Sequence, residues 1–449
     1  MNPKSLKGKL LLRNEINLSD ESIQQLLQSN QLTTIPAITK HTFHYQCNRC
    51  MTTKREHFAM IPCARCHTTH PYCRNCLRTG RVLFCEKLYL WAGHDAAWPE
   101  QLNPCHWEGS LTRHQLQAAE AIQKAATLTG QELLIWAVCG AGKTEMLFPG
   151  ITTAIKEGKS ICLATPRADV VRELYPRFQE AFPNTEIEAL YGGTEERTGT
   201  GQLVIATTHQ LIRYHQAFDL MIIDELDAFP YHTDKDLHKL SQRAKKSHAT
   251  TIYLTATPRK KEQRRIEANQ LPVIFVPIRF HGHPLPVPKL QLDISLQKKL
   301  KQSKLPESIT TFIQSRAPKR QFLLFVPTVE MLPQMEEMLK GFSLTFTTVH
   351  AEDPERKEKV NAYRNQEYDL LITTTILERG VTFPSIDVVI LDAGHEVFDE
   401  AAIVQIAGRA GRSPQDPTGE VLLIHQGKTN AIVNAVRQIK QMNEKGSKL

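Results

Sequence analysis

Short apolar runs alternate with longer amphipathic stretches over most of the chain beyond residue 108. Residues 133–138 and 220–223 are almost wholly apolar, which is typical of strands buried on both faces of a parallel sheet. Further strand-like runs follow at residues 322–326, 344–349, 370–372 and 388–391. Strands that alternate with helices predict an α/β fold. We therefore expect two tandem doubly wound parallel sheets, one over residues 108–277 and one over residues 319–449.

Three segments lie outside these two lobes. Residues 278–318 are rich in proline and lysine, with prolines at 284, 286 and 288, which predicts a linker that is partly helical around residues 294–304. Residues 1–40 carry a short helical pattern for which Ser19 or Asp20 fits the N-cap. Residues 41–107 form a cysteine-rich module with its connector.

The composition is that of a globular protein. The chain has 449 residues, 41% hydrophobic and 23% charged, so disorder of the whole chain is excluded. No stretch approaches the ~18 consecutive apolar residues that a membrane-spanning helix requires. The first residues, Met-Asn-Pro-Lys-Ser, lack the apolar segment of a secretion signal. We therefore expect a cytoplasmic protein.

The net charge of +8 is concentrated in one segment. Residues 40–90 contain nine basic residues against two acids, a balance of +7. A second basic stretch spans residues 428–449. Clustered cations of this kind indicate a polyanionic partner, either nucleic acid or an anionic membrane surface.

Eight of the ten cysteines lie between residues 47 and 105, and six of them form three Cys-x2-Cys pairs: Cys47/Cys50, Cys63/Cys66 and Cys73/Cys76. In a reducing cytosol such pairs favour a structural Zn²⁺ site over disulfides. The spacing allows any two of the three pairs to share one ion. Cys85, His67 and His70 can also complete a second site. Redox-active or free thiols are the alternative, but no βαβ pattern surrounds the pairs.

The chemistry of the first lobe begins directly after residues 133–138. The segment there is Cys139-Gly140-Ala141-Gly142-Lys143-Thr144, and a helical stretch follows it. Glycines let backbone N–H groups wrap a phosphate at a helix N-terminus, where the helix dipole favours anions. Lys143 would neutralise phosphate oxygens, and the Thr144 hydroxyl would bind Mg²⁺. The sequence therefore predicts a phosphate-binding loop for a nucleoside triphosphate.

A pair of carboxylates follows the second apolar run of the first lobe. Residues 220–223 end in Asp224 and Glu225, at the tip of a predicted central strand. Asp224 suits Mg²⁺, and Glu225 is placed to orient and deprotonate an attacking water. An acidic turn without function is the alternative for a lone pair, but the upstream phosphate loop favours a hydrolytic site.

The ordered motifs resemble those of superfamily 2 helicases over about residues 110–425. The residues that carry the resemblance are Thr165-Pro166-Arg167, Ala206-Thr207-Thr208-His209-Gln210, Asp224-Glu225-Leu226-Asp227, Thr255-Ala256-Thr257, Thr373 to Gly380 and Gln405 to Arg412. The resemblance implies two RecA-like lobes that close on ATP. It implies nucleotide contacts from Gln115, Cys139, Gly140, Ala141, Gly142, Lys143, Thr144, Glu145 and Gln405. The implied catalytic residues are Lys143, Asp224, Glu225, Arg409 and Arg412, with Thr255 and Thr257 coupling hydrolysis to movement.

Longer phrases resemble the ComFA family of late competence proteins of Gram-positive bacteria. These include Cys47-Asn48-Arg49-Cys50, Tyr72-Cys73-Arg74-Asn75-Cys76, Ala141 to Met146, Asp227 to Tyr231, Arg279-Phe280-His281-Gly282 and Thr375 to Pro384. The resemblance implies an ATPase stimulated by single-stranded DNA that drives transforming DNA inward. It also implies a peripheral place on the inner face of the membrane, ComEC as the channel and ComFC as a companion. Some members match only at the 47/50 and 73/76 pairs, which ranks those four cysteines as the leading zinc ligands ahead of Cys63 and Cys66.

Three alternatives compete with this interpretation. A PriA-like helicase also combines zinc with such lobes, but its cysteine cluster interrupts the second lobe. A DEAD-box-like RNA helicase typically has Asp-Glu-Ala-Asp and Ser-Ala-Thr where this chain has Asp-Glu-Leu-Asp and Thr-Ala-Thr. A non-enzymatic zinc scaffold that binds nucleic acid predicts loss of a hydrolytic residue, but Lys143, Glu225 and Arg412 are all present.

Overall fold

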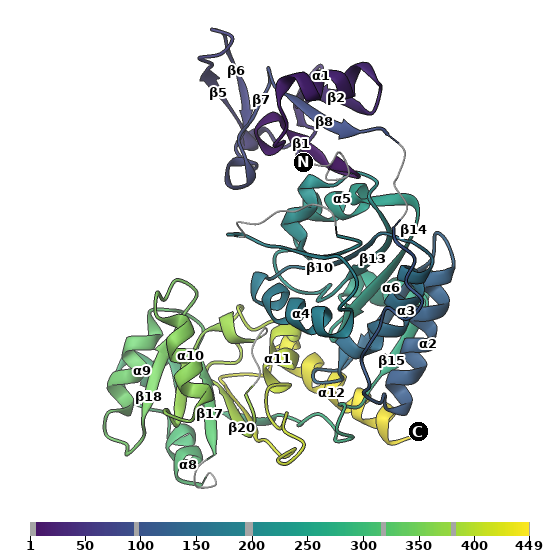
Figure 1. The fold of residues 1–449 in the computed structure, drawn as a ribbon. Coiled ribbons are helices and arrows are strands. Elements are labelled where there is room, and N and C mark those ends of the chain that lie inside the picture. Colours follow the sequence, from purple (N-terminus) through teal and green to yellow (C-terminus); the bar gives the residue numbers. More distant parts are fainter. Residues whose placement is uncertain (1–5, 94–97, 194–200, 316–319, 379–382, 449) are drawn as a thin grey trace.

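The computed structural model describes residues 6–93, 98–193, 201–315, 320–378 and 383–448 (Figure 1). Two α/β lobes follow one another along the chain, and a small N-terminal module lies against the first. The predicted architecture of two doubly wound parallel-sheet lobes behind a cysteine-rich module is confirmed. Part of one predicted motif, residues 379–382, lies outside the described residues.

The first lobe is built on a seven-stranded sheet in which every pairing is parallel. In spatial order its strands are β11 (Ile187–Leu190), β12 (Leu203–Thr207), β10 (Ile161–Thr165), β13 (Phe218–Ile223), β14 (Lys245–Thr255), β9 (Glu132–Ala137) and β15 (Val273–Val276). Its helices are α2 (Arg113–Thr127), α3 (Lys143–Lys156), α4 (Ala168–Ala181), α5 (Lys235–Ala244) and α6 (Lys260–Glu267), with a 3-10 segment at Thr208–Arg213. Strands β9 and β13 are the two predicted from apolar runs.

The second lobe has a six-stranded sheet, also parallel throughout. Its strands in spatial order are β16 (Lys289–Leu292), β21 (Val421–His425), β20 (Ile386–Ile390), β17 (Gln321–Phe325), β19 (Leu370–Thr373) and β18 (Phe346–Val349). Its helices are α7 (Leu296–Lys301), α8 (Glu307–Ser315), α9 (Met331–Leu339), α10 (Arg356–Arg364), α11 (Glu400–Ala407) and α12 (Asn430–Ser447), with a 3-10 turn at Thr375–Leu377.

The stretch expected as a linker, residues 278–318, contributes structure to the second lobe. Strand β16 pairs in parallel with β21 and forms the edge of that sheet. Leu296 and Leu300 of α7 are buried in its core, beside Ile309 and Phe312 of α8. The proline-rich composition predicted a break, but it did not show that the chain re-enters a sheet directly after the last of these prolines.

Helix α12 connects the last part of the chain to the first lobe. The Gln438 side chain donates a hydrogen bond to the Ala256 carbonyl at 2.7 Å, and the Lys445 ammonium lies 4.3 Å from the centre of the Phe275 ring. A Cβ on Gly446 would lie 2.5 Å from the Ile278 side chain, so only glycine allows this approach. The basic C-terminal stretch is therefore partly used to join the lobes.

The N-terminal module consists of small antiparallel sheets (Figure 1). One contains β1 (Leu10–Leu12), β8 (Lys87–Trp91) and β2 (Leu32–Pro36), and the helix α1 (Asp20–Gln28) is capped by Ser19. The others are the pair β3 (Ile38–Lys40) and β4 (Tyr45–Cys47), and the sheet β5 (Phe58–Pro62), β6 (Thr69–Cys73) and β7 (Val82–Leu83), with 3-10 turns at Arg13–Glu15, Arg55–His57 and Leu77–Thr79. Because β8 pairs with β1 and β2, residues 6–40 and 87–91 fold as one unit.

Candidate active site and metal centre

The phosphate loop lies between β9 and α3, in the strand–loop–helix arrangement that the sequence predicted. Gly140 and Gly142 have φ of +80° and +69°, a region that L-residues with side chains avoid. Gly142 caps α3, whose first residue is Lys143. The loop therefore lies at the N-terminus of α3, where the positive end of the helix dipole suits a phosphate.

The predicted carboxylates follow β13. Asp224 accepts a hydrogen bond from the backbone N–H of Glu225 at 2.8 Å, and Glu225 itself has φ of +51°. A non-glycine residue in this region costs about 1–2 kcal/mol, and such strain gathers at functional sites. Asp224 and Glu225 line the same cavity as Lys143 and Thr144. The chemistry of that set, an ammonium with a hydroxyl and two carboxylates, suits a Mg²⁺-bound triphosphate.

Asp227 lies in the core of the first lobe and receives hydrogen bonds from two predicted coupling residues. The Thr255 hydroxyl donates to one carboxylate oxygen of Asp227, and the Thr257 hydroxyl donates to the other. The Asp227 carbonyl in turn accepts from Arg259 at 3.0 Å. The acidic turn after β13 is therefore tied to the end of β14 and to Arg259.

The second lobe contributes arginines to the same site. Asp399 caps α11, and Gln405 on that helix accepts a hydrogen bond from the Cys139 thiol of the phosphate loop at 3.0 Å. Arg409 follows the helix, is 1% exposed and donates through Nε to the Glu378 carbonyl at 3.1 Å. Arg412 lines the cavity as well. Both predicted arginines thus face the crevice between the lobes.

One cavity of about 730 Å³ collects these groups from both lobes. Burial and the neighbouring Arg412 lower the pKa of Arg409 and lower the pKa of Arg279 to about 10. Nη1 of Arg409, which lines the cavity, is buried and has no hydrogen-bond acceptor among the described residues. Desolvated cations without acceptors are costly unless an anion satisfies them. The cavity therefore fits a polyphosphate.

Gln115 contacts the loop itself. Its side-chain oxygen accepts from the Thr112 backbone N–H at 2.8 Å, and its Nε2 donates to the Ala141 carbonyl at 2.9 Å. These bonds hold the loop against the start of α2. Glu145, in the first turn of α3, accepts from Arg177 of α4.

The sequence did not predict several residues at the cavity. Phe280, His281 and Trp107 line the cavity. Next to Phe280, Arg279 is 1% exposed and donates to the Gly411 carbonyl across the lobes. The ComFA resemblance includes the phrase with Arg279, but it implies no role for this residue. Its position depends on the chain turning back after β15, and no local pattern shows that.

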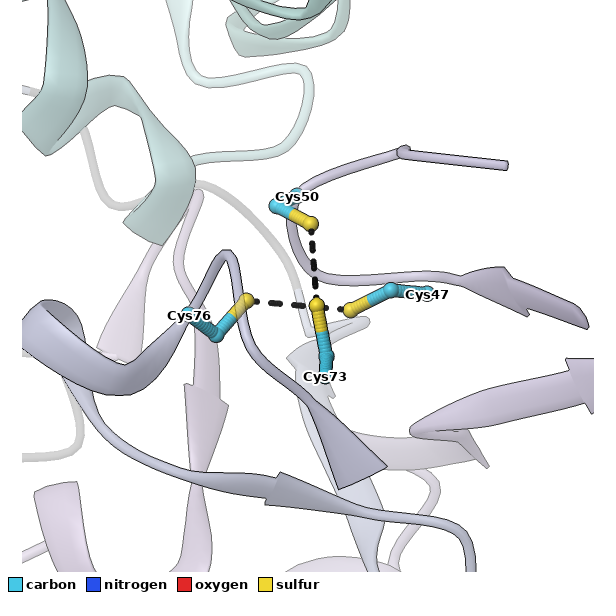
Figure 2. A group of neighbouring side chains, drawn as sticks. All are labelled: Cys47, Cys50, Cys73 and Cys76. Atoms are coloured by element: carbon cyan, nitrogen blue, oxygen red, sulfur yellow. Dashed lines mark hydrogen bonds between the residues drawn. The ribbon is translucent and has the colours of Figure 1, made fainter. Parts of the chain in front are cut away.

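The cysteines at 47, 50, 73 and 76 meet at one point (Figure 2). All four are at most 1% exposed. The sulfurs of Cys47 and Cys76 lie 3.7 Å apart, and those of Cys50 and Cys73 lie 3.5 Å apart. Tetrahedral Zn²⁺ with Zn–S bonds of ~2.3 Å requires sulfurs ~3.8 Å apart. The donor set therefore fits zinc, and it is the set that the resemblance ranked first.

Cys63 and Cys66, the remaining predicted ligands, lie in another cluster with His70 and Cys85. They do not share the centre of the first four cysteines. His67, the other histidine considered, is in neither cluster. The sequence had left this division open.

The first cluster is attached to the first lobe. Arg243 of α5 donates to the carbonyls of Asn48 and Arg49 at 3.0 and 2.6 Å. Arg49 is itself buried and pairs with Glu15 at 2.7 Å. The four cysteines share an apolar cluster with residues of β13 and α5. The four-cysteine cluster and the first lobe therefore form one packed body.

Comparison with known proteins identifies the family. The "Competence protein ComFA N-terminal domain" model matches residues 2–90, and the chain is 42% identical to competence protein ComFA of Bacillus subtilis over 99% of its length and 96% of that protein. The chain belongs to the ComFA family. The ComFA of Streptococcus pneumoniae is 35% identical, with 97% of both chains covered. Models for the type III restriction enzyme res subunit and the helicase conserved C-terminal domain match residues 108–260 and 301–414.

Solved helicase structures share the fold of the two lobes. Saccharomyces cerevisiae Dbp5 bound to RNA and ADP BeF3 has a TM-score of 0.51 and 16% identity over 74% of this chain and 92% of that one. RecG bound to a three-way DNA junction has a TM-score of 0.52 and 18% identity over 76% and 47%. These likenesses show the fold; the family match and the two domain models support a competence-associated, helicase-like ATPase. Among the described residues, no helix combines the length and apolarity needed to span a bilayer.

Proposed function

We propose that this ComFA-family protein hydrolyses ATP in the cavity between its lobes and uses the cycle to move single-stranded DNA during transformation. One observation carries the proposal. Lys143 and Glu225 of the first lobe line a single cavity with Arg409 and Arg412 of the second. A triphosphate in this cavity would be bound by both lobes at once, so its hydrolysis would change how tightly the lobes hold together.

Each side chain has a task that its position supports. The loop N–H groups and Lys143 bind phosphate oxygens, while Thr144 and Asp224 would hold Mg²⁺, which supplies charge neutralisation. Glu225 orients a water and accepts its proton. Arg409 and Arg412 stabilise the charge that develops as the phosphoryl group leaves, and Gln405 positions them by bonding to the loop.

Contacts between the lobes explain how the change at the nucleotide would spread. Arg259 pairs with Asp399 at 2.7 Å, Arg356 pairs with Asp169 at 2.8 Å, and Arg167 lies 3.6 Å from Glu378. Arg259, which also donates to the Asp227 carbonyl, is thereby joined to Asp399, the N-cap of α11. The route from the carboxylates to the arginines is therefore short and continuous.

The N-terminal module would hold the strand. It carries most of the chain's net positive charge, and Phe43 in the turn between β3 and β4 is 96% exposed. Exposed aromatic rings among cations are suited to stacking on unpaired bases. Zn²⁺ bound by the four buried cysteines would fold this module. The proposal includes a place at the inner face of the membrane, with ComEC and ComFC as partners.

ATP turnover with single-stranded DNA, duplex DNA and RNA, compared side by side, tests the proposal. Single-stranded DNA should stimulate most, and binding should weaken steeply with added salt if phosphate contacts dominate. Lys143→Ala and Glu225→Gln should abolish turnover while the protein stays folded. Lys156→Ala, which changes an exposed lysine at the far end of the same helix, is the matched control.

Two results would contradict the proposal. Wild-type turnover in Lys143→Ala would remove the site assignment. Stimulation by RNA alone would leave the ATPase site in place but favour an RNA helicase over a DNA motor.

A further inference from the structure

The second cluster in the N-terminal module contains three sulfurs and one imidazole. Donor atoms of Cys63, Cys66, His70 and Cys85 lie within 4.8 Å of one another. The Cys63 and Cys85 sulfurs are 3.7 Å apart, and the Cys66 sulfur is 3.1 Å from Nε2 of His70. A tetrahedral ion with bonds of ~2.0–2.3 Å fits between donors at these separations.

The turn that carries Cys63 and Cys66 repeats the backbone of the turn that carries the first two cysteines. In both turns the residue after the second cysteine has a positive φ, +63° at Met51 and +53° at His67. Its N–H donates to the carbonyl of the first cysteine, at 2.8 Å to Cys47 and 2.9 Å to Cys63. The first cysteine's own N–H donates to the carbonyl five residues on, at 3.1 and 3.0 Å. Because the two turns share one backbone geometry, the Cys63/Cys66 turn presents its two thiols in the same way as the Cys47/Cys50 turn.

The β5–β6–β7 sheet brings the other two ligands to this turn. His70 lies on β6 opposite Ile61, directly beside the turn that joins β5 to β6. Beyond β7, the Phe84 N–H donates to the Pro71 carbonyl at 3.0 Å, which carries Cys85 alongside His70. Residues 63, 66, 70 and 85 are thus assembled from three separate parts of the module by backbone pairing.

The same sheet keeps the two clusters apart. His70 and Cys73 are three positions apart on β6, so they are roughly 10 Å apart along the strand and on opposite faces. One ion cannot use both. The clusters also differ in exposure, because Cys66 and Cys85 are exposed whereas the four cysteines of the first cluster are buried.

We propose that Cys63, Cys66, His70 and Cys85 bind a second structural zinc ion, so that one chain holds two. Four protein ligands leave no open position for a substrate, so this ion ties the tip of the β5–β6 hairpin to the end of β7. The proposal is independent of ATP hydrolysis.

The zinc content of the full-length protein tests the proposal. The protein is purified under reducing conditions and washed free of loosely bound metal, and its zinc is then measured by elemental analysis and native mass spectrometry. Wild type and the control Cys105→Ser, whose cysteine is in neither cluster, should hold two zinc ions. Cys66→Ser/Cys85→Ser should hold one. His70→Ala should lose the same ion, and His70→Cys should restore it because it keeps four ligands.

A chelator supplies the second measurement on wild type. Zinc release should be biphasic, with the ion of the exposed cluster leaving first, and Cys66→Ser/Cys85→Ser should lose the fast phase. One zinc per wild-type chain, or two in Cys66→Ser/Cys85→Ser, would overturn the proposal. If the variants do not fold, the wild-type count alone decides.

Discussion

Replacing Gly142 with alanine tests whether the shape of the phosphate loop limits turnover. Gly142 has φ of +69°, and a Cβ there would lie 2.4 Å from Nε2 of Gln115. The left-handed backbone costs an alanine about 1–2 kcal/mol. Gln115 must also move, which breaks its bond to the Ala141 carbonyl and costs ~1 kcal/mol more.

The two costs together give about 2–3 kcal/mol. They apply to the loop conformation that binds phosphate, and ~1.4 kcal/mol corresponds to a tenfold change. We therefore expect kcat/KM for ATP to fall about 30- to 150-fold in Gly142→Ala, measured by steady-state turnover with saturating single-stranded DNA.

Gly158→Ala is the matched control. Gly158 follows the end of α3, has φ of +67°, and a Cβ added there would have no heavy atom within 4 Å. The Gly158→Ala variant has the same free-energy cost of a left-handed alanine, but it should keep the wild-type kcat/KM. Gln115→Ala combined with Gly142→Ala should lose less than the two single losses summed, because the clash is gone. An equal loss in both glycine variants would refute the reasoning, since stability alone would then explain the effect.

Three further changes have expected outcomes. Asp399→Asn keeps a good helix cap but weakens a half-exposed ion pair with Arg259. We therefore expect kcat to fall no more than about fivefold and the thermal midpoint of unfolding to stay unchanged. A complete loss of turnover would contradict this. Phe43→Ala should weaken single-strand binding by about 1–3 kcal/mol in a fluorescence titration, with zinc content unaltered. Cys73→Ser should lower zinc by one ion per chain and weaken strand binding; unchanged zinc would show that the first ligand set is wrong.

Local motifs explain what the sequence made predictable. The phosphate loop and the carboxylates each follow an apolar strand. The sequence within about ten residues is therefore enough to predict that both lie at strand ends. The parallel sheets bring the strand ends to one edge without further information. The placement of Lys143 and Glu225 in one cavity was therefore within reach of the sequence.

Features that depend on distant contacts were out of reach. Pair spacing allowed any two Cys-x2-Cys turns to share an ion, and the register of β5 against β6 is what separates them. Arg279 reaches the Gly411 carbonyl only because the chain folds back after β15. The pairing of β16 with β21 likewise joins segments far apart in the chain, which a proline-rich composition cannot reveal.

The attachment of the N-terminal module determines what a motor cycle would move. Arg243 of α5 bonds to the turn that carries Cys47 and Cys50, and Arg213 of the first lobe lies 3.5 Å from Glu15. Figure 1 shows the module beyond the first lobe, on the side away from the second. A strand held by the module therefore stays fixed relative to the first lobe, and opening and closing of the cavity would shift the second lobe along it. Gln405 and Arg259 make two of the contacts between the lobes that would break and re-form in such a cycle.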